Sequence, residues 1–364
     1  MTKSNQYFPE TVPHPGATLK EKLGELEIGP KEFAIKTGKP EQTISKILNN
    51  QSSITGEMAV KFEKVLKIPA HFWLNNQSRY DEYISRLKFE KEIQCAEEWA
   101  RKFPIREMVD HGWIQADRTI KSRVIALFSF FSIANKKAWE RYYLKQDLKV
   151  SFRISLSHAN NPYALSAWLR KGEILASDID APEFDKNALK SKLSQLKDLM
   201  AEQPDDFFDK IKKYCLEAGL KVIYTPKLPK APISGSTRWL LNNPVIQLTN
   251  RYKRNDIFWF TFFHELGHVL LHGKKDIFLE NIDYSGKDLD KEKEADNFAI
   301  RWTFTKEEEN ELLKKTHINE NEIYHFAKEC NTHPAMIIGR LQKRGIISYQ
   351  MGQNFIQKIE ISNN

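Results

Sequence analysis

The chain has 364 residues, 41% of them hydrophobic and 29% charged, a composition typical of a globular protein with two or three domains. Its longest apolar run, residues 257–263, is too short for a membrane span, and residues 1–16 lack the apolar core of a secretory signal, so we expect a cytoplasmic protein with no membrane partner. Three widely spaced cysteines argue against a disulfide framework or a cysteine-built zinc site, whereas the net charge of +8 permits binding to nucleic acid without establishing it.

Residues 16–74 alternate short helical patterns with turn signals, which predicts a compact bundle of short helices. Pro30 and Pro40 stand where helices begin, and Gly38 stands where one ends. The two helices on either side of this glycine are predicted to form a helix-turn-helix. Their apolar residues can meet in a small core made by Phe33, Ala34, Ile44, Ile47 and Leu48.

The second of these helices keeps a polar face outside that core, made by Glu41, Gln42, Thr43, Ser45, Lys46 and Asn49. Amide side chains pair with adenine edges, threonine contacts a thymine methyl, and lysine reaches guanine or phosphate. The face is therefore suited to the major groove of double-stranded DNA. The alternative is an ordinary helical bundle whose polar face is only solvated.

The stretch from Pro13 to about Tyr80 resembles the antitoxins of the HigA type, a branch of the XRE (Cro/C1-like) helix-turn-helix family. The segment "GEMAVKFEKVLKIPAHFWLNNQ" is especially specific to that branch. The resemblance implies a homodimer that binds operator DNA, often represses its own operon and sometimes neutralises a cognate toxin. We assign residues 1–80 to this domain.

Residues 81–217 are rich in helix formers and lack a flexible linker, so we expect a helical connecting region whose aromatic residues form a core. It ends in a helix closed near Gly219 and the strand "LKVIYT". The runs "STRWLL" and "PVIQLTN" bracket a turn at Asn242–Asn243 and predict a small antiparallel sheet. The fold class is thus mostly α, with an all-α N-terminal domain and an α+β zincin-like domain.

His264 and His268 are four residues apart in the apolar stretch "FTFFHELGHVLLH", so on a helix they project from nearly the same face. Both imidazoles can bind one divalent cation while Glu265 reaches a water beside it, which is the H-E-x-x-H signature of zinc metallopeptidases. Gly267 permits close approach of a backbone or a substrate. The alternative is a helix with satisfied core histidines, and for His272 a structural role is favoured over ligation.

A catalytic zinc usually needs a third protein ligand. The helical stretch 290–302 places Glu292 and Asp296 on one face, together with two small alanines that allow close packing. We expect Glu292 to be the third ligand and Asp296 to orient a ligand histidine. Glu294 is the competing ligand, although it lies about 200° around the helix from Glu292.

The segments "FWFTFFHELGHVLLH" and "EKEADNFA" resemble the ImmA/IrrE family of zinc metallopeptidase domains, over roughly residues 218–347. The resemblance implies Zn²⁺ as cofactor, His264 and His268 as ligands, Glu265 as catalytic base and a glutamate of "EKEA" as third ligand. It also implies a repressor protein as a substrate. This chain continues with "IRWTFTKEE", where many members have an "LLMP"-like stretch, so the substrate cleft differs from theirs.

The C-terminal piece "NENEIYHFAKECNTHPAMIIGRLQKRGII" has two helical patterns that are predicted to pack as a cap on the peptidase domain, rather than to form a second DNA-reading element. Residues 348–364 form a tail. Two functions from different classes follow: a regulator with a conditionally active zinc endopeptidase, or a non-catalytic repressor or antitoxin with a structural or sensory zinc site. Glu265 favours the first, because a structural zinc needs no general base. For cleavage we expect an extended substrate to pair with "PVIQLT" as an edge strand.

Overall fold

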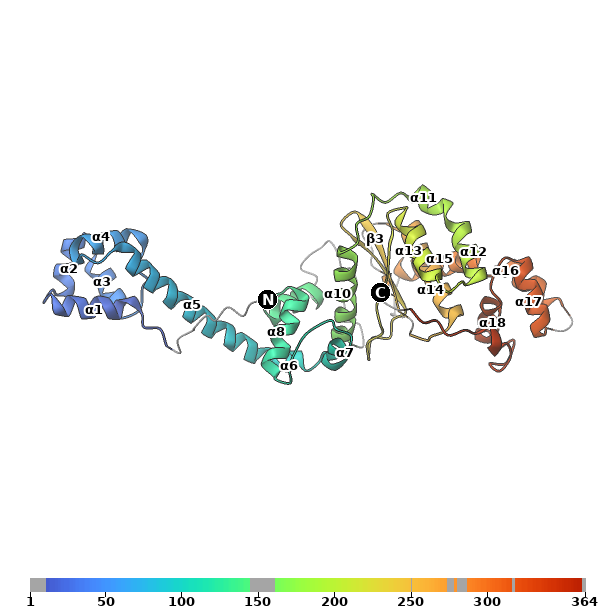
Figure 1. Cartoon of the computed structure of the whole chain (residues 1–364), viewed down its shortest axis with the longest axis horizontal. Helices are drawn as coiled ribbons and strands as arrows, with labels where there is room; N and C mark the ends of the chain where they lie inside the picture. Colours follow the sequence, from blue (N-terminus) through green and yellow to red (C-terminus); the bar gives the residue numbers. More distant parts are fainter. Residues whose placement is uncertain are drawn as a thin grey trace. The chain divides into compact units, whose positions relative to one another are not determined.

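The computed structural model of the chain describes residues 11–144, 161–249, 251–273, 278–279, 287–315 and 318–361. The chain forms two compact units, Met1–Cys95 and Ala96–Asn364 (Figure 1). The fold is mostly helical with one small sheet, and the sheet lies in the second unit, which agrees with the expected fold class.

The described residues of the first unit form a bundle of five helices around one apolar core. Gly38 ends α2 in the left-handed conformation at φ 61°, and its N–H is bonded to the last turn, so the chain can turn into α3. The expected core residues Phe33, Ala34, Ile44 and Ile47 are buried together. The helices are α1 (Pro15–Glu25), α2 (Pro30–Thr37), α3 (Glu41–Leu48), α4 (Gly56–Leu66) and α5 (Ala70–Cys95).

The second unit begins with helices that precede the sheet: α6 (Glu97–Ala100), α7 (Ile105–Asp110), α8 (Ile120–Phe131), α9 (Lys136–Trp139), η1 (Glu140–Leu144), α10 (Pro162–Ser177), α11 (Lys186–Ser191), α12 (Leu193–Glu202) and α13 (Phe207–Leu216). The remaining elements are β1 (Lys221–Tyr224), β2 (Gly235–Leu240), β3 (Asn243–Leu248), α14 (Asn255–Leu271), β4 (Phe278–Leu279), α15 (Lys287–Thr303), α16 (Lys306–Leu313), α17 (Glu320–Glu329), α18 (Pro334–Lys343) and η3 (Gln353–Phe355).

The sheet has the strand order β1-β3-β2-β4. The expected hairpin of β2 and β3 is antiparallel, and its two-residue loop is 241–242, one residue earlier than the sequence suggested. β1 pairs with β3 in parallel, so the sheet is mixed, and the expectation of an antiparallel sheet holds only for β2 with its two neighbours. Because β3 is hydrogen-bonded on both sides, "PVIQLT" is an inner strand, and the expectation that it forms an edge for a substrate is wrong.

Opposite faces of the sheet carry different helices. Successive side chains of a strand point to opposite faces, and in β2 the Thr237 hydroxyl contacts α14 whereas Arg238 contacts α10. The main apolar core of the unit lies on the α14 face. Figure 1 shows α10 between the sheet and helices α6 to α8. The buried helix α14 contacts β2 and β3 and also packs against α15, so it lies between the sheet and α15.

The C-terminal helices pack as the sequence predicts. Their apolar residues form a separate small core with residues of α16, and this core includes Ile323, Phe326, Ala327, Ile337 and Leu341. The chain after them returns to the start of α14. There Asn255 donates its backbone N–H to the Gln357 carbonyl and accepts the Gln357 N–H on its side chain. This end of the chain thus anchors the helix that carries the histidines.

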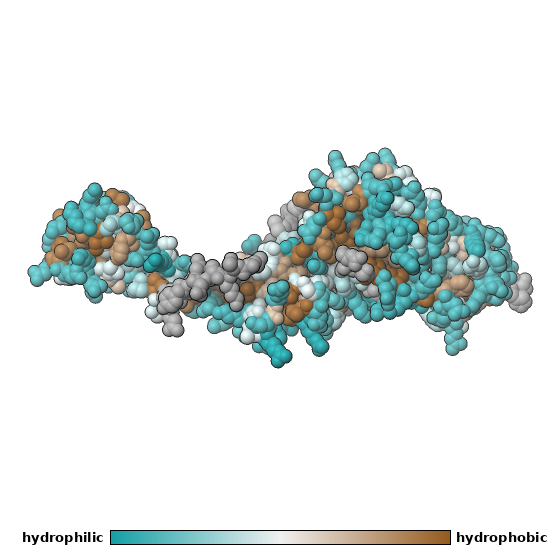
Figure 2. Space-filling view, viewed as in Figure 1, coloured by the Kyte–Doolittle hydropathy of each residue, from teal (hydrophilic) through white to brown (hydrophobic). Residues whose placement is uncertain are grey.

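Among the described residues, no helix is both long and apolar enough to cross a membrane. The face of the molecule in Figure 2 is largely hydrophilic and is interrupted by smaller apolar patches.

Candidate metal centre and helix-turn-helix surface

Most side chains of α14 are apolar, on every side of the helix, as expected for a helix that packs against the sheet and neighbouring helices. His264 and His268 are 4% and 2% exposed within it, and Glu265 is fully buried. Polar groups at such depth are costly unless they are bonded or bind a ligand. Their partners therefore show what this part of the molecule is built to hold.

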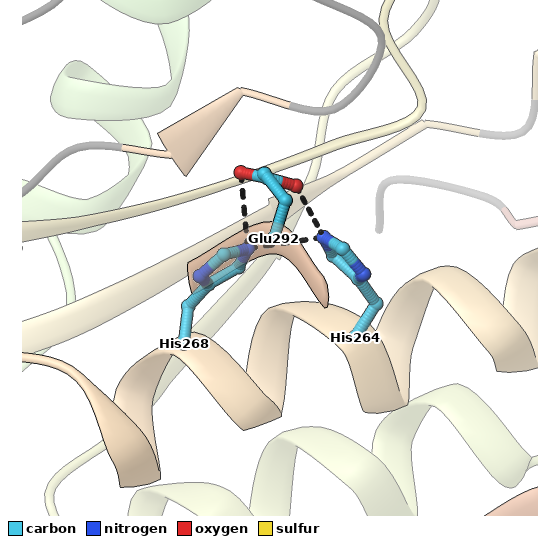
Figure 3. Close-up of side chains that lie close together, drawn as sticks. All are labelled: His264, His268 and Glu292. Carbon is cyan, nitrogen blue, oxygen red and sulfur yellow. Dashed lines mark hydrogen bonds and ion pairs between the residues drawn. The ribbon is translucent and has the colours of Figure 1, made fainter. Parts of the chain in front are cut away.

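Both histidines point from α14 toward one carboxylate of α15 (Figure 3). The His264 Nε2 atom lies 3.1 Å from a Glu292 oxygen, and the His268 Nε2 atom lies 3.5 Å from the other oxygen. The two Nε2 atoms are 3.0 Å apart. One ligand atom from each of the three residues lies within 4.8 Å of the other two, so one small cation can contact all three.

The outer ring nitrogens are bonded to further groups. The Nδ1 atom of His264 lies 2.9 Å from Asp296. The Nδ1 atom of His268 lies 3.0 Å from His272 Nδ1, and His272 Nε2 lies 3.0 Å from Glu294. The partners of each ring determine which of its nitrogens carries the proton. Protons on His264 Nδ1, His268 Nδ1 and His272 Nε2 satisfy every one of these contacts.

This assignment leaves two Nε2 lone pairs facing each other and a carboxylate. Such groups repel unless a proton or a cation lies among them. Two zinc ligands at a Zn–N distance of about 2.05 Å in a tetrahedron are roughly 3.3 Å apart, close to the observed separation of the nitrogens. Imidazole and carboxylate are also ligands of zinc. The residues present therefore fit a zinc ion.

The pKa values describe the same set of groups without a metal. Burial opposes the charge on His264, but hydrogen bonds to Asp296 and Glu292 outweigh it and raise its pKa to about 10. Burial lowers the pKa of His268 to about 4. Burial also opposes the charge on Glu292, but hydrogen bonds to both histidines lower its pKa to about 2. Near neutral pH the two histidines thus share one positive charge beside the ionised carboxylate of Glu292.

Glu265 lies one residue from His264 and takes no part in the ligand set. Its carboxylate accepts a 2.6 Å hydrogen bond from the hydroxyl of Thr237 on β2, and the same hydroxyl lies 3.0 Å from the Glu265 carbonyl. Thr237 therefore orients the expected catalytic base. The sequence analysis did not identify Thr237, although its position in a strand just before the histidine helix is a usable signal.

The close packing of α15 on α14 places Glu292 within reach. A Cβ atom on Gly267 would lie 3.1 Å from the Cβ of Phe298 and 3.2 Å from the Cα of Ala295. This glycine therefore serves contact between the two helices. The competing glutamate, Glu294, bonds to His272, so the structure places Glu292 rather than Glu294 against the ligand histidines.

The expected DNA-reading residues lie on α3 of the first unit, with Asn49 at its C-cap. Glu41, Gln42, Lys46 and Asn49 are exposed, whereas Thr43 and Ser45 are partly buried. The opposite side of α3 is anchored by the buried Ile44 and Ile47. The helix thus presents a polar face of amide, hydroxyl and ammonium groups while its apolar face packs in the bundle.

Comparison with known proteins identifies the family of the N-terminal helix-turn-helix. Residues 19–73 match the helix-turn-helix family. The chain is 34% identical over 68 residues to the helix-turn-helix-type transcriptional regulator YddM of Escherichia coli, which is 19% of this chain and 72% of that protein. The chain belongs to the helix-turn-helix transcriptional regulators. This regulator is also 41% identical over 70 residues to virulence-associated protein A of Dichelobacter nodosus, which is 19% of this chain and 69% of that protein.

The second part of the regulator matches a different family. Residues 215–331 match the IrrE N-terminal-like domain, the M78 peptidase family, and this range includes the three candidate ligands. Among solved structures, the regulator is similar to a HigA-family addiction module antidote protein of Coxiella burnetii, with 33% identity over 23% of this chain and 91% of that chain, and a TM-score of 0.22. It is likewise similar to the antitoxin HigA of Pseudomonas aeruginosa, solved with the higBA promoter, with 30% identity over the same shares and a TM-score of 0.22.

Proposed function

We propose that this protein is an operator-binding regulator of the HigA type whose IrrE-like domain is a zinc-dependent endopeptidase for a partner protein. The observation that carries the peptidase half is the convergence of two Nε2 lone pairs and the Glu292 carboxylate beside the buried Glu265. Membership of residues 215–331 in the IrrE-like family supports it. The substrate is a repressor protein, and its cleavage is conditional; a cognate toxin is a partner that the protein would bind and neutralise.

His264, His268 and Glu292 would hold the ion, and Asp296 and His272 would orient the two imidazoles. A zinc ion supplies a Lewis acid that polarises a peptide carbonyl and lowers the pKa of water. Glu265, held by Thr237, takes a proton from the attacking water and passes it to the leaving amine as the C–N bond breaks. The chain thus provides both a ligand set and a separate base.

The DNA-binding half of the proposal rests on α3 and on the family of residues 19–73. The exposed Gln42 and Lys46 would contact base edges and phosphates in the major groove. Two copies would bind a palindromic operator, with half-sites about one helical turn, roughly 34 Å, apart.

The competing function is a repressor with a structural or sensory metal site that cuts nothing. The positioned Glu265 disfavours it, because a metal that only stabilises the fold needs no oriented base. The two functions predict different behaviour for one variant, Glu265→Gln. This variant keeps the size and hydrogen bonding of the side chain and removes its basicity.

The experiment compares wild type with Glu265→Gln in stressed cells of the native host and follows loss of candidate regulators by mass spectrometry. We expect the variant to lose cleavage by at least about 100-fold while it retains about one zinc per chain and the same operator affinity. The double variant His264→Ala/His268→Ala is the control for metal content and should bind no zinc. Identical cleavage patterns in wild type and Glu265→Gln, under every condition that changes expression of the target operon, would assign the metal to a non-catalytic role.

A further inference from the structure

A pocket of about 810 Å³ lies in the second unit, on the side of the sheet opposite to the candidate metal centre. Its walls are α8, α10 and the segment between α7 and α8. The pocket contains none of the metal-site residues. Its volume is within the roughly 300–1,000 Å³ of small-molecule sites, so it has room for a small ligand.

One wall of the pocket is aromatic. The rings of Trp113 and Phe130 both line it, and they are parallel to within 4° with centroids 6.4 Å apart. Ile125 and Ile174 add aliphatic surface. A wall of this kind favours a flat apolar body, because rigid aromatic rings supply a large apolar contact area at little cost in conformational entropy.

Two cations line the same pocket, Arg170 and Lys121. The Arg170 guanidinium donates to the Phe130 carbonyl, the Ser132 hydroxyl and Glu173, at 3.0, 2.9 and 2.9 Å. A guanidinium has five N–H donors, so these contacts among the described residues leave two for a ligand. Fixed and partly buried, this donor group is suited to a carboxylate or phosphate oxygen.

The local charge also favours an anion. Glu173 is shared, because its second oxygen lies 3.2 Å from the buried guanidinium of Arg238. One carboxylate therefore faces two arginines. Among the lining residues that the structure describes, the acidic one is Asp117, which is engaged on one oxygen by the N–H and hydroxyl of Thr119, both at 2.6 Å. Lys121 and Arg170 are the cations of this described lining, so it has a net positive charge.

The shared carboxylate links the pocket to the candidate metal centre. An anion on the two remaining N–H donors of Arg170 lies beside the Glu173 carboxylate and repels it, and Glu173 holds Arg238 on β2. The preceding residue of that strand, Thr237, holds the carboxylate of Glu265 on the opposite face. We propose that the pocket binds a small organic anion with a flat apolar body and passes its occupancy to Glu265 through Glu173 and Arg238.

Binding is tested on the full-length protein with 8-anilino-1-naphthalenesulfonate as the fluorescent anion. We expect one site per chain, displacement by 1-naphthoate or 1-naphthyl phosphate, and at least about tenfold weaker displacement by the neutral 1-naphthalenemethanol. Better displacement by 1-naphthoate would indicate a carboxylate ligand, and better displacement by 1-naphthyl phosphate would indicate a phosphate ligand. Equal displacement by the neutral compound would overturn the anion site.

Variants separate the pocket from nonspecific binding. Lys121→Gln should weaken the probe by about five- to tenfold, whereas Lys137→Gln, which removes an exposed lysine outside the lining, should change affinity by less than twofold. Ser129→Trp fills the pocket from an exposed position and should abolish binding, with circular dichroism as the check on folding. Full binding by a folded Ser129→Trp protein, or equal losses in the two lysine variants, would refute the site.

The link to Glu265 rests on the proposed function and has its own readout. In the cobalt-substituted protein, 1-naphthoate should shift the visible absorption of the metal, and Glu173→Gln should bind the anion but lose the shift. Binding without any shift in wild type would refute the link. Because probe binding needs no metal, failure of the proposed peptidase would leave the binding result intact.

Discussion

Glu294 and Asp296 stand two residues apart on α15, yet each carboxylate holds a different imidazole. Asp296 contacts the ring of His264 directly, whereas Glu294 reaches His268 only through His272. A carboxylate that accepts the Nδ1 proton fixes the tautomer and leaves Nε2 free for a metal. The two acidic residues should therefore contribute unequally to metal affinity.

Asp296→Asn should weaken zinc binding by about 10- to 100-fold, because the amide holds the His264 ring less strongly than the carboxylate. Glu294→Gln should have a smaller effect, because its influence passes through His272. The matched control is Asp290→Asn on the same helix, whose exposed carboxylate pairs with Lys293. Zinc affinities from competition with a chelator decide the order, and an Asp296→Asn protein that binds zinc like the control would contradict the proposed role.

The cysteines should differ in reactivity because only the thiolate is the nucleophile. Burial raises the pKa of Cys215 above its usual range, and burial together with nearby glutamates raises the pKa of Cys330 to about 12. Cys95 is exposed. At pH 8 an alkylating reagent should label Cys95 first, as followed by peptide mass spectrometry. Labelling of Cys215 at the rate of Cys95 in folded protein would show that Cys215 is not in the core.

At the scale of elements, α3 and α14 use opposite designs. α3 buries one face and exposes a polar one, which suits a surface that meets another molecule. α14 is buried on nearly all sides, so its two histidines, its glutamate and its glycine all face protein. The exposed positions of α3 can therefore be varied without loss of folding, whereas α14 tolerates few changes.

Replacing Gln42 with alanine should relax base preference at one operator position, with a loss of about 1–3 kcal/mol for the preferred base. Replacing Lys46 with alanine should weaken binding to all sequences and reduce the dependence on salt by about one released ion. Lys64→Ala, an exposed lysine on α4, is the control and should leave the salt dependence unchanged. Titrations with operator and random DNA at several salt concentrations test both effects. A folded wild-type protein that binds its own promoter no better than random DNA would contradict the operator-binding proposal.

At the scale of the whole molecule, the chain contains separate cores in two units. The core of the first unit draws only on residues of α1 to α5 and the loops between them. The core around α14 combines residues from α11 to α15 with the sheet and the C-terminal end. A metal ion on α14 and α15 should therefore stabilise the second unit alone.

Zinc removal should lower the melting temperature of one transition and leave the other in place. A ligand at about 1,000 times its Kd adds about 4 kcal/mol of stability. For a domain of roughly 150–250 residues this corresponds to about 8–16 °C. Differential scanning calorimetry with and without a chelator measures the shift, and the His264→Ala/His268→Ala variant should show none. An equal shift of both transitions would contradict independent cores.

Sequence alone determined the features that depend on local periodicity. Four-residue spacing places His264 and His268 on one side of any helix. A glycine directly after a helical pattern marks the end of that helix, as Gly38 does for α2. The apolar positions of the C-terminal helices, the hairpin of β2 and β3 and the helix-turn-helix follow from the same kind of pattern. Each of these needs only a few neighbouring residues, because the period of a helix or strand is a property of the backbone.

Only the tertiary structure decided which faces of these elements meet. The orientation of α15 where it packs against Gly267 places Glu292 beside His264 and His268, and it places Glu294 beside His272. The strand order places β3 inside the sheet, and the pleat of β2 directs Thr237 to Glu265 and Arg238 to α10. Partners far apart in sequence are selected by the packing of whole elements, and the free energy of that packing depends on every face that is buried at once.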